Sequence, residues 1–375
     1  MANIISRIGY RLLRPYGWLK SQEQRLFSKK TKEEYPIDFV VTWVDGNDKE
    51  WQKSKALYSG NYMVQKEGNT DARYRDWGLM RYWLRAVEKY APWVNKIYFV
   101  TCGHKPDYLN LENKKLVFIT HEQFIPKNYL PTFNSFTIEL NLWRIPGLSE
   151  HFVYFNDDMF VNRPVYPEDF FFAGLPKLCA LAIPFCFKGD REKQNWVRTL
   201  LNDIAIINSD FEIRNALRKY PEKFYSYVYR RCTKYNRRIF EDNYLAGMRF
   251  THSVQTYLKS TFSEIWDREY QIMDKTCQFK FRNEAQVTSF LPTLWMIFSG
   301  RFVPVSEDYF GKAINLSSNT LSLAIDALQS DSRIICLNDN EEMDLESLET
   351  IQIMQDSIRK SMEKKYPSVS SFERN

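Results

Sequence analysis

Short apolar runs alternate along the first half of the chain with longer segments whose apolar residues recur at helical spacing. The run over residues 37–44 is rich in β-branched and aromatic residues, follows Pro36 and ends in the polar turn 45–48. This pattern predicts a buried β-strand. Three further runs of the same kind predict strands over residues 97–101, 116–120 and 152–155.

The segments between these strands carry a helical pattern. Residues 49–90 are predicted to be helical, and Pro92 ends that helix. A second helix is predicted over residues 135–143. Strands that alternate with helices are typical of an α/β fold with a mainly parallel sheet and helices on both faces.

The remaining sequence divides the chain into three predicted parts. Residues 1–34 form a basic N-terminal arm, and residues 35–320 form the α/β domain. Within that domain, residues 190–300 are mostly helical in pattern and predict a helical insertion that caps the sheet. Residues 321–375 are predicted to be a C-terminal helical tail, because a polar amphipathic helix spans 344–364.

Composition is that of a globular protein and excludes several enzyme classes. The 27 Phe, 23 Tyr and 10 Trp supply a sizeable core, which a disordered chain lacks. The 13 glycines form neither a dinucleotide-binding loop nor a P-loop, and neither a nucleophile elbow nor a zinc-protease helix occurs. The 6 cysteines include no C-x-x-C pair, which argues against a disulfide-rich module and a cysteine zinc site.

No segment has the length or apolarity of a membrane-spanning helix. The longest apolar run, residues 178–187, contains Pro184 and is far shorter than the roughly 20 residues that a span requires. Arginines interrupt the apolar residues near the N-terminus, so no signal peptide is expected. These features predict a protein of a reducing compartment.

The net charge of +6 is concentrated in the first 30 residues. The rest of the chain is balanced, which argues against nucleic-acid binding by the body. The bases of this arm are Arg7, Arg11, Arg14, Lys20, Arg25, Lys29 and Lys30, beside one acid, Glu23.

The arm also has the pattern of an interfacial helix. Ile4, Ile5, Ile8 and Leu12 recur at helical spacing, with Arg7, Arg11 and Arg14 near the opposite face. Pro15 is expected to end this helix and to leave Tyr16, Trp18 and Leu19 as further anchors. Residues 1–30 are thus predicted to bind an anionic membrane surface, and the alternative is a solvated, disordered tail.

Carboxylates follow two of the predicted strands. Asp45 comes after the first strand, and the adjacent pair Asp157 and Asp158 comes after the fourth. Since the carboxyl ends of parallel strands share one edge, these side chains should face one crevice. Neighbouring carboxylates repel each other unless a divalent cation, such as Mg²⁺ or Mn²⁺, lies between them. A strand-terminating turn is the alternative interpretation.

Other polar residues admit both a functional and a structural interpretation. His252 is a candidate for acid–base chemistry, but a lone histidine is often only a structural group. Arg282 is either a ligand of an anion or a surface ion-pair residue. Arg75 and Arg81 flank Asp76 and predict either an anion site or an ion-paired helix start.

Two long blocks of the chain carry a sequence pattern far more specific than a three-residue motif. The first block is Asp38-Phe39-Val40-Val41-Thr42-Trp43-Val44-Asp45-Gly46. The second begins at Arg73-Tyr74-Arg75-Asp76, continues through Leu130-Pro131-Thr132-Phe133-Asn134-Ser135 and closes with Asn156-Asp157-Asp158-Met159-Phe160. These blocks resemble the Stealth proteins, a family of sugar-1-phosphate transferases that includes bacterial capsular polysaccharide phosphotransferases and an animal N-acetylglucosamine-1-phosphotransferase. Weaker third and fourth blocks place His252 and Arg282. The third has Val254 where the family usually has proline, and the fourth has Gln286 where it usually has aspartate.

The resemblance implies phosphoryl transfer on a Rossmann-like (GT-A-like) fold. A hydroxyl of a glycan or lipid-linked glycan acceptor would attack a nucleotide-diphosphate sugar, expected to be UDP-linked, and release a nucleoside monophosphate. The implied catalytic residues are Asp157, Asp158, His252 and Arg282, with the two aspartates also holding Mg²⁺ or Mn²⁺. The implied substrate-binding residues are Trp43, Asp45, Arg75, Asp76, Arg81, Asn134, Asn156 and Lys259.

Several alternatives remain open at the level of sequence. The general base is either His252 or an aspartate, in which case His252 only binds the phosphate. A metal-dependent glycosyltransferase would use similar carboxylates but release a nucleoside diphosphate. A non-catalytic polysaccharide-binding protein is a third possibility. The expected location is the bacterial cytoplasm, at the inner face of the membrane.

Overall fold

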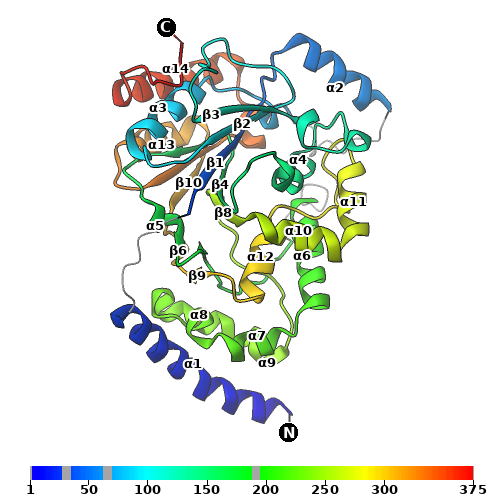
Figure 1. The fold of residues 1–375 in the computed structure, drawn as a ribbon, viewed down its shortest axis with the longest axis vertical. Helices are drawn as coiled ribbons and strands as arrows, with labels where there is room; N and C mark the ends of the chain where they lie inside the picture. Colours follow the sequence, from blue (N-terminus) through cyan, green and yellow to red (C-terminus); the bar gives the residue numbers. More distant parts are fainter. Residues whose placement is uncertain (1, 28–34, 62–69, 188–194, 375) are drawn as a thin grey trace.

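The computed structural model describes residues 2–27, 35–61, 70–187 and 195–374, and its centre is a five-stranded sheet (Figure 1). The strand order is β3-β2-β1-β4-β8, and β3, β2, β1 and β4 are parallel while β8 pairs antiparallel with β4 at the edge. The mainly parallel sheet predicted from the sequence is confirmed. The strands are β1 (Ile37–Thr42), β2 (Ile97–Thr101), β3 (Leu116–Thr120), β4 (His151–Phe155) and β8 (Gln255–Leu258).

Helices lie on both sides of this sheet, which explains why its central strands are almost continuously apolar. Trp83 of α3 packs edge-on against Phe155 of β4, with 5.4 Å between ring centroids. On one side in Figure 1 lie α3 (Met80–Tyr90), α13 (Leu321–Gln329) and α14 (Leu348–Lys365). On the other lie α4 (Ser135–Asn141), α10 (Lys259–Arg268) and α11 (Tyr270–Gln278).

One buried carboxylate aligns the starts of three strands. Asp38 of β1 is fully buried, and its Oδ1 accepts hydrogen bonds from the Asn95 side chain (2.7 Å) and the Lys96 backbone N–H (3.1 Å). Its Oδ2 accepts from the Ser149 backbone N–H (2.7 Å), just before β4. Because a buried carboxylate is stable only with such partners, Asp38 ties β1 to the segments that lead into β2 and β4.

A second sheet joins the C-terminal region to the core. It has the order β10-β11-β5, with strands β10 (Gly311–Asn315), β11 (Ile334–Asn338) and β5 (Met159–Val161). Since β5 follows β4 after a short turn, this sheet continues from the main one. Residues 321–375 are therefore not only the helical tail expected from the sequence, because they supply the middle strand of this sheet.

The segment expected to be a helical cap is mostly helical, although β8 lies within it. Besides α10 and α11, its helices include α6 (Asn195–Asp210), α7 (Ile213–Lys219), α9 (Asn236–Asp242) and α12 (Phe290–Phe298). Every residue of α12 is buried, as expected for a helix that is apolar on all sides. The other short elements are α2 (Lys49–Asn61), α5 (Pro167–Phe170), β6 (Phe171–Phe172), β7 (Leu175–Leu178), α8 (Pro221–Phe224), the 3₁₀ segment η7 (Tyr227–Tyr235) and β9 (Val303–Pro304).

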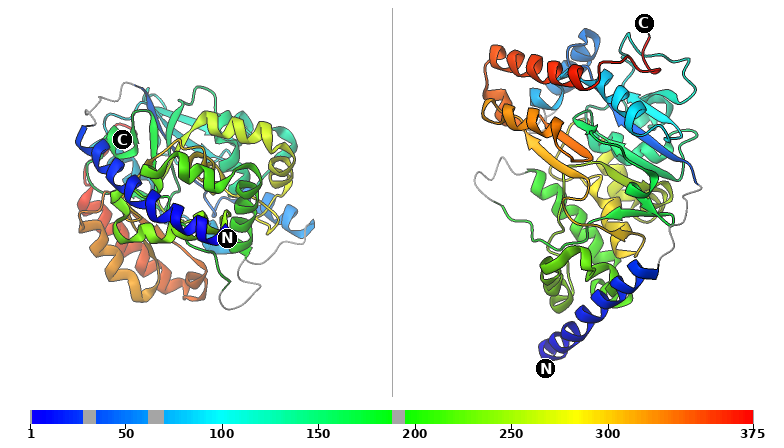
Figure 2. Two further views of the ribbon diagram at one scale, coloured as in Figure 1. Left: turned by 90° about the horizontal axis from the view of Figure 1, so that it is seen from below. Right: turned by 90° about the vertical axis from the view of Figure 1, so that its left-hand side faces the viewer.

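The N-terminal arm is one long helix, α1 (Ala2–Phe27), which lies along α8, α9 and η7 (Figure 2). The prediction that Pro15 ends this helix is wrong, because the helix continues through it. Pro15 is exposed, so water can satisfy the carbonyl that loses its partner, and packing on α8 offsets the lost hydrogen bond. No helix of the described residues is long and apolar enough to cross a membrane.

A buried ion pair links the C-terminus to α3 and gives a test of this architecture. The Arg85 guanidinium donates to both carboxylate oxygens of Glu373 (2.8 and 2.9 Å), and the two side chains are 9% and 3% exposed. We expect Glu373→Gln to lower the free energy of unfolding by about 3–5 kcal/mol, because it leaves a buried guanidinium without its counter-charge. Urea denaturation measures this change.

The control is Glu50→Gln, which removes the exposed partner of Lys53 and should cost at most about 1 kcal/mol. Burial by itself would raise the pKa of Glu373. Hydrogen bonds from Arg85 and Ser370 outweigh burial and hold this pKa below its ordinary value of 4.5. The pair therefore stabilises the fold above that pH, and the difference between wild type and Glu373→Gln should shrink on acidification below it. A difference that is absent at pH 7 would contradict this account.

Candidate active site

A cavity of about 260 Å³ lies at the carboxyl edge of the main sheet, where β1 and β4 end side by side. Its walls combine the turn after β4 with segments from several other parts of the chain. Of the residues predicted from the sequence, those that line it are Trp43, Arg75, Asp76, Asn156, Asp157, Asp158, His252 and Arg282. The structure thus brings together side chains that lie more than 200 positions apart in the sequence.

The direction of β8 decides which of the third-block residues reaches this edge. Because β8 runs antiparallel to β4, with Gln255 opposite Tyr154 and Leu258 opposite His151, the segment before β8 lies at the carboxyl end of β4. His252 therefore enters the cavity. Lys259 follows β8 and lies at the opposite edge, where its ammonium donates to the Leu148 carbonyl (3.3 Å) and does not line the cavity.

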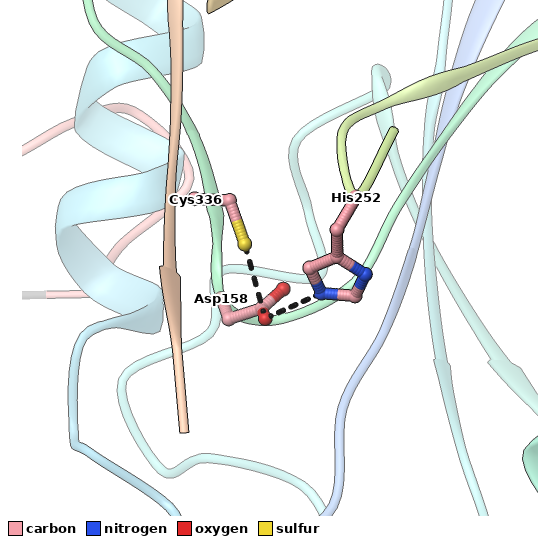
Figure 3. Close-up of side chains that lie close together, drawn as sticks. All are labelled: Asp158, His252 and Cys336. Carbon is pink, nitrogen blue, oxygen red and sulfur yellow. Dashed lines mark hydrogen bonds and ion pairs between the residues drawn. The ribbon is translucent and has the colours of Figure 1, made fainter. Parts of the chain in front are cut away.

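Asp158 is the centre of a small hydrogen-bonded cluster (Figure 3). Its Oδ2 accepts a hydrogen bond from His252 Nε2 (3.0 Å) and another from the Cys336 thiol of β11 (3.2 Å). Since a carboxylate only accepts, Nε2 carries the hydrogen and Nδ1 of His252 is the free acceptor of the neutral ring. Asp158 Oδ1 has no hydrogen-bond partner among the described residues, although it is buried.

Burial and charge shift the pKa values of this cluster. Burial alone would lower the pKa of His252, but the neighbouring Asp158 carboxylate outweighs it and raises the pKa above its usual value. Burial, and then the charge of Asp158, raise the pKa of Asp157 far above the ordinary range. Burial likewise raises the pKa of the Cys336 thiol, which is consistent with its role as a donor to Asp158.

These residues could hold a divalent cation. The charges of Asp76 and Asp339 also raise the pKa of Asp157, so several carboxylates crowd one side of the cavity and oppose each other's ionisation. A cation relieves such crowding, and the unpartnered Oδ1 of Asp158 is a free oxygen ligand. Cys336 adds a sulfur, since its Sγ lies within 4.8 Å of ligand atoms of Asp158 and His252.

Arg282 presents its guanidinium to the cavity and forms no ion pair with any described residue. Its Nη2 donates to the Ser135 hydroxyl (2.6 Å), and its Cζ lies 4.6 Å from the Phe136 ring centroid. The amide of Gln286 fixes the loop by accepting from Asn283 N–H (2.6 Å) and donating to the backbone carbonyl of Thr276 (2.8 Å). Gln286, which stands where the family usually has aspartate, thus has a structural role in this loop.

Arg75 differs from Arg282, because carboxylates already surround it. Its Nη1 donates to both oxygens of Asp339 (2.9 and 2.7 Å), and its Nη2 donates to Asp344 (2.6 Å). Trp77 Nε1 donates to the same Asp339 carboxylate (2.8 Å). Arg75 therefore anchors the segment after β11 at the cavity wall, which favours the ion-paired interpretation that the sequence left open beside an anion site.

Three other predicted residues do not line the cavity. Arg81 is exposed and stacks over Tyr108, 4.7 Å from the ring centroid. Asp45 accepts the Asn47 backbone N–H (2.9 Å) within the turn after β1. Asn134 is buried and caps α4, because its side-chain Oδ1 accepts a hydrogen bond from the backbone N–H of Phe136 (3.2 Å). Each of these side chains stabilises a local segment near the site.

The structure adds three residues that the sequence interpretation missed, Glu139, Cys336 and Asp339. Glu139 is a buried carboxyl of α4, and its burial raises its pKa although the charge of Arg282 opposes this. It is the single charged residue of α4, and this could have identified it from the sequence. Asp339 follows the apolar strand β11, as Asp157 follows β4, and this shared pattern was a usable signal.

A second cavity, of about 600 Å³, adjoins the first on the side of the helical cap. Trp196, Phe250 and Phe290 give it an aromatic wall. The two cavities share Glu139, Asn156, His252 and Arg282 among their lining residues. These four residues therefore lie where the two cavities meet.

The sequence matches two models of Stealth proteins, conserved region 1 over residues 35–63 and conserved region 2 over residues 73–177. It is 39% identical over 338 residues to the capsular polysaccharide phosphotransferase WcwK of Streptococcus pneumoniae, covering 90% of this chain and 98% of that protein. It is 36% identical over 340 residues to the receptor polysaccharide phosphotransferase WefC of Streptococcus gordonii, covering 90% and 98%. The exopolysaccharide phosphotransferase cps2G of Lactiplantibacillus plantarum is 34% identical over 356 residues, covering 93% and 100%.

Likeness to solved structures is distant. The galactosyltransferase LgtC, in complex with donor and acceptor sugar analogs, has a TM-score of 0.36 and 9% identity, covering 85% of this chain and 95% of that one. Mouse xyloside xylosyltransferase 1 has a TM-score of 0.33 and 11% identity, covering 81% and 97%. At this level the likeness carries no information about the reaction. The matched regions and the relatives aligned over nearly their whole length confirm the resemblance seen in the sequence: the chain belongs to the Stealth family.

Proposed function

We propose that the protein transfers a sugar-1-phosphate from a UDP-linked sugar to a hydroxyl of a glycan acceptor, in the synthesis of a capsular or other surface polysaccharide. The names of the three relatives described above, each a polysaccharide phosphotransferase, support this assignment. The observation that carries it is the set of side chains that face the smaller cavity, close to its junction with the larger one. They are a carboxylate pair, a carboxylate-bound histidine and an arginine free of ion pairs with described residues.

The reaction makes one bond to phosphorus and breaks another. The acceptor oxygen attacks the sugar-side phosphorus, the bond from that phosphorus to the bridging oxygen breaks, and the nucleoside monophosphate leaves with that oxygen. The proton of the hydroxyl passes to Nδ1 of His252. Asp158 supports this transfer because it holds Nε2–H, fixes the tautomer and stabilises the charged ring.

The remaining demand is neutralisation of the diphosphate charge. Arg282 presents a planar fork of donors, which suits phosphate oxygens. Asp157 and Asp158 would hold Mg²⁺ or Mn²⁺ through carboxylate oxygens. Bound there, the cation would supply positive charge to the diphosphate and the leaving phosphate.

Each of the two cavities is assigned to one of the two substrates. We assign the nucleotide sugar to the smaller one, where Trp43, Trp51 and Tyr74 offer aromatic surface to the base. The acceptor glycan, free or lipid-linked, enters the larger one, whose wall includes Trp196 and Phe250. The attacking hydroxyl and the phosphorus then meet beside His252 and Arg282.

We further propose that the enzyme acts in the bacterial cytoplasm, attached peripherally to the inner face of the membrane through residues 1–30. The arm carries the whole net charge of +6, and the balanced remainder offers no reason to propose a nucleic-acid partner. Peripheral attachment would bring the active site close to a lipid-linked acceptor.

The metal hypothesis predicts that a chelator abolishes transfer and that Mg²⁺ or Mn²⁺ restores it. Asp157→Asn and Asp158→Asn should each cripple turnover, since each removes a carboxylate that would otherwise hold the cation. Release of nucleoside monophosphate measures the rate, and an unchanged melting temperature shows that the fold persists. Asp267→Asn, at an exposed position of α10, is the matched control. Full activity in chelator would exclude this role.

The second prediction concerns the proposed base and the phosphate ligand. We expect His252→Ala to lower kcat by about 10²–10⁴-fold and Arg282→Ala by about 10³–10⁵-fold, because they remove proton transfer and charge stabilisation respectively. Arg374→Ala, at an exposed position, should stay near wild type. If His252→Ala only weakens donor binding, an aspartate is the base and His252 binds the phosphate. If both variants retain about a third of wild-type activity or more, the assignment is wrong.

The third prediction separates phosphoryl transfer from ordinary glycosyl transfer. Phosphorus NMR of the products should show a new phosphodiester together with a nucleoside monophosphate, because the phosphorus–oxygen bond breaks. A metal-dependent glycosyltransferase would instead release a nucleoside diphosphate and leave the glycan without phosphorus. That result would replace the proposed reaction with the alternative.

A further inference from the structure

The arm helix α1 is fixed to the protein body along one face. Tyr10 and Ser21 are buried in this contact, and Ser21 Oγ accepts the Tyr227 backbone N–H (3.0 Å). At Gly17 the helix approaches α8 so closely that a β-carbon would lie 2.3 Å from the Pro221 carbonyl oxygen. A larger residue therefore cannot be accommodated there without separating the helices. The arm is a packed helix with a defined inner face.

Part of the positive charge of the arm is used within the protein. Arg14 Nε donates to the Thr233 hydroxyl (3.0 Å), and Lys20 forms an ion pair with Glu222 (3.3 Å). Both contacts lie on the inner side of α1. These two bases are therefore less available to a membrane than the sequence suggested, whereas Arg11 remains exposed.

The outer face of α1 carries exposed apolar side chains, together with one exposed acid, Glu23, near the end of the helix. Leu12, Tyr16 and Leu19 are spaced to share one face of the helix, and they are 70%, 55% and 61% exposed. Trp18 beside them is 43% exposed. Figure 2 shows α1 running across the lower end of the molecule, with its N-terminal part projecting beyond the body. The side chains of Arg7, Ile4, Ile5 and Ile8 lie outside the described part of the structure.

A second basic segment lies against the same helix. Residues 230–238 contact α1 through Thr233, which binds Arg14, and through the Arg237 guanidinium, 5.9 Å from the Tyr10 ring centroid. Tyr235 within it is 42% exposed. Its exposed bases are Arg230, Arg231, Lys234, Arg237 and Arg238.

Two of these bases are compensated and three are not. Arg237 and Arg238 pair with Glu241 and Asp242 along α9. Arg230, Arg231 and Lys234 form no ion pair with any described residue. The body is neutral in total, yet the fold gathers this excess of positive charge in a segment that packs against α1.

We propose that the outer face of α1 and the basic segment 230–238 form one docking surface for an anionic phospholipid membrane. The exposed leucines and aromatic rings suit burial at the headgroup boundary, and the flanking bases attract anionic lipid. This inference deepens the peripheral attachment proposed above by adding a second element from the protein body. Because α1 is packed against α8, the surface holds the enzyme in one orientation rather than on a loose tether.

Flotation of the full chain with phosphatidylcholine vesicles, with and without phosphatidylglycerol, tests the surface. We expect binding to the anionic vesicles only, and less of it as salt rises. Arg230→Gln/Arg231→Gln/Lys234→Gln should lower the partition coefficient by about 10–100-fold, since each base near the surface contributes roughly 1 kcal/mol at most. Leu12→Glu/Leu19→Glu should reduce binding at least about tenfold, because it places charges in the apolar face.

Matched controls change equally exposed residues elsewhere. They are Leu345→Glu/Leu348→Glu and Lys105→Gln/Lys114→Gln/Lys360→Gln, and both should bind like wild type. Equal binding to neutral vesicles, or a triple glutamine variant at 230, 231 and 234 that binds normally, would overturn the proposal. A dimer that Leu12→Glu/Leu19→Glu dissociates, without vesicle binding, would assign the surface to a second copy. No sugar substrate is involved, so failure here leaves the catalytic proposal standing.

Discussion

The carboxylate of Asp158 is the interaction on which the rest of the site depends. It lies in the turn between β4 and β5, binds His252 from the segment before β8, and accepts the thiol of Cys336 from β11. Its backbone carbonyl also accepts the N–H of Leu337 (2.9 Å). Because a buried carboxylate is costly without partners, these contacts hold three distant segments in one place. The sheets and the active site are therefore built around the same residue.

The distribution of paired charges explains which arginine remains available to a substrate. Arg75 and Arg85 bind carboxylates of the C-terminal region, Asp339 and Glu373, and so join the first third of the chain to the last. Arg282 is held by a hydroxyl and an aromatic ring instead. Since the guanidinium of Arg75 has already met its counter-charge, Arg282 is better suited than Arg75 to the phosphate contact that we propose. The two arginines are thus distinguished by their partners.

The same principle divides the two faces of α1. Arg14 and Lys20 bind residues of η7 and α8, and the small residues of the inner face pack against the same elements. The exposed apolar side chains of α1 lie on its outer face. The helix continues through Pro15 because tertiary packing supplies more stabilisation than one backbone hydrogen bond removes. The candidate active site and the arm lie in different parts of the fold, so the proposed catalysis and the proposed attachment can be tested separately.

The sequence by itself determined the elements whose signals are local. Strands β1 to β4, helix α4 and the carboxylate pair after β4 follow from runs of neighbouring residues, and the long blocks up to Phe160 identified the family. Only the tertiary structure decided that β8 runs antiparallel, which brings His252 to the carboxyl edge and takes Lys259 away from it. It likewise brought in Cys336 and Asp339 and paired Arg75. These outcomes depend on strand pairing and charge compensation between residues far apart in the chain, which no local pattern records.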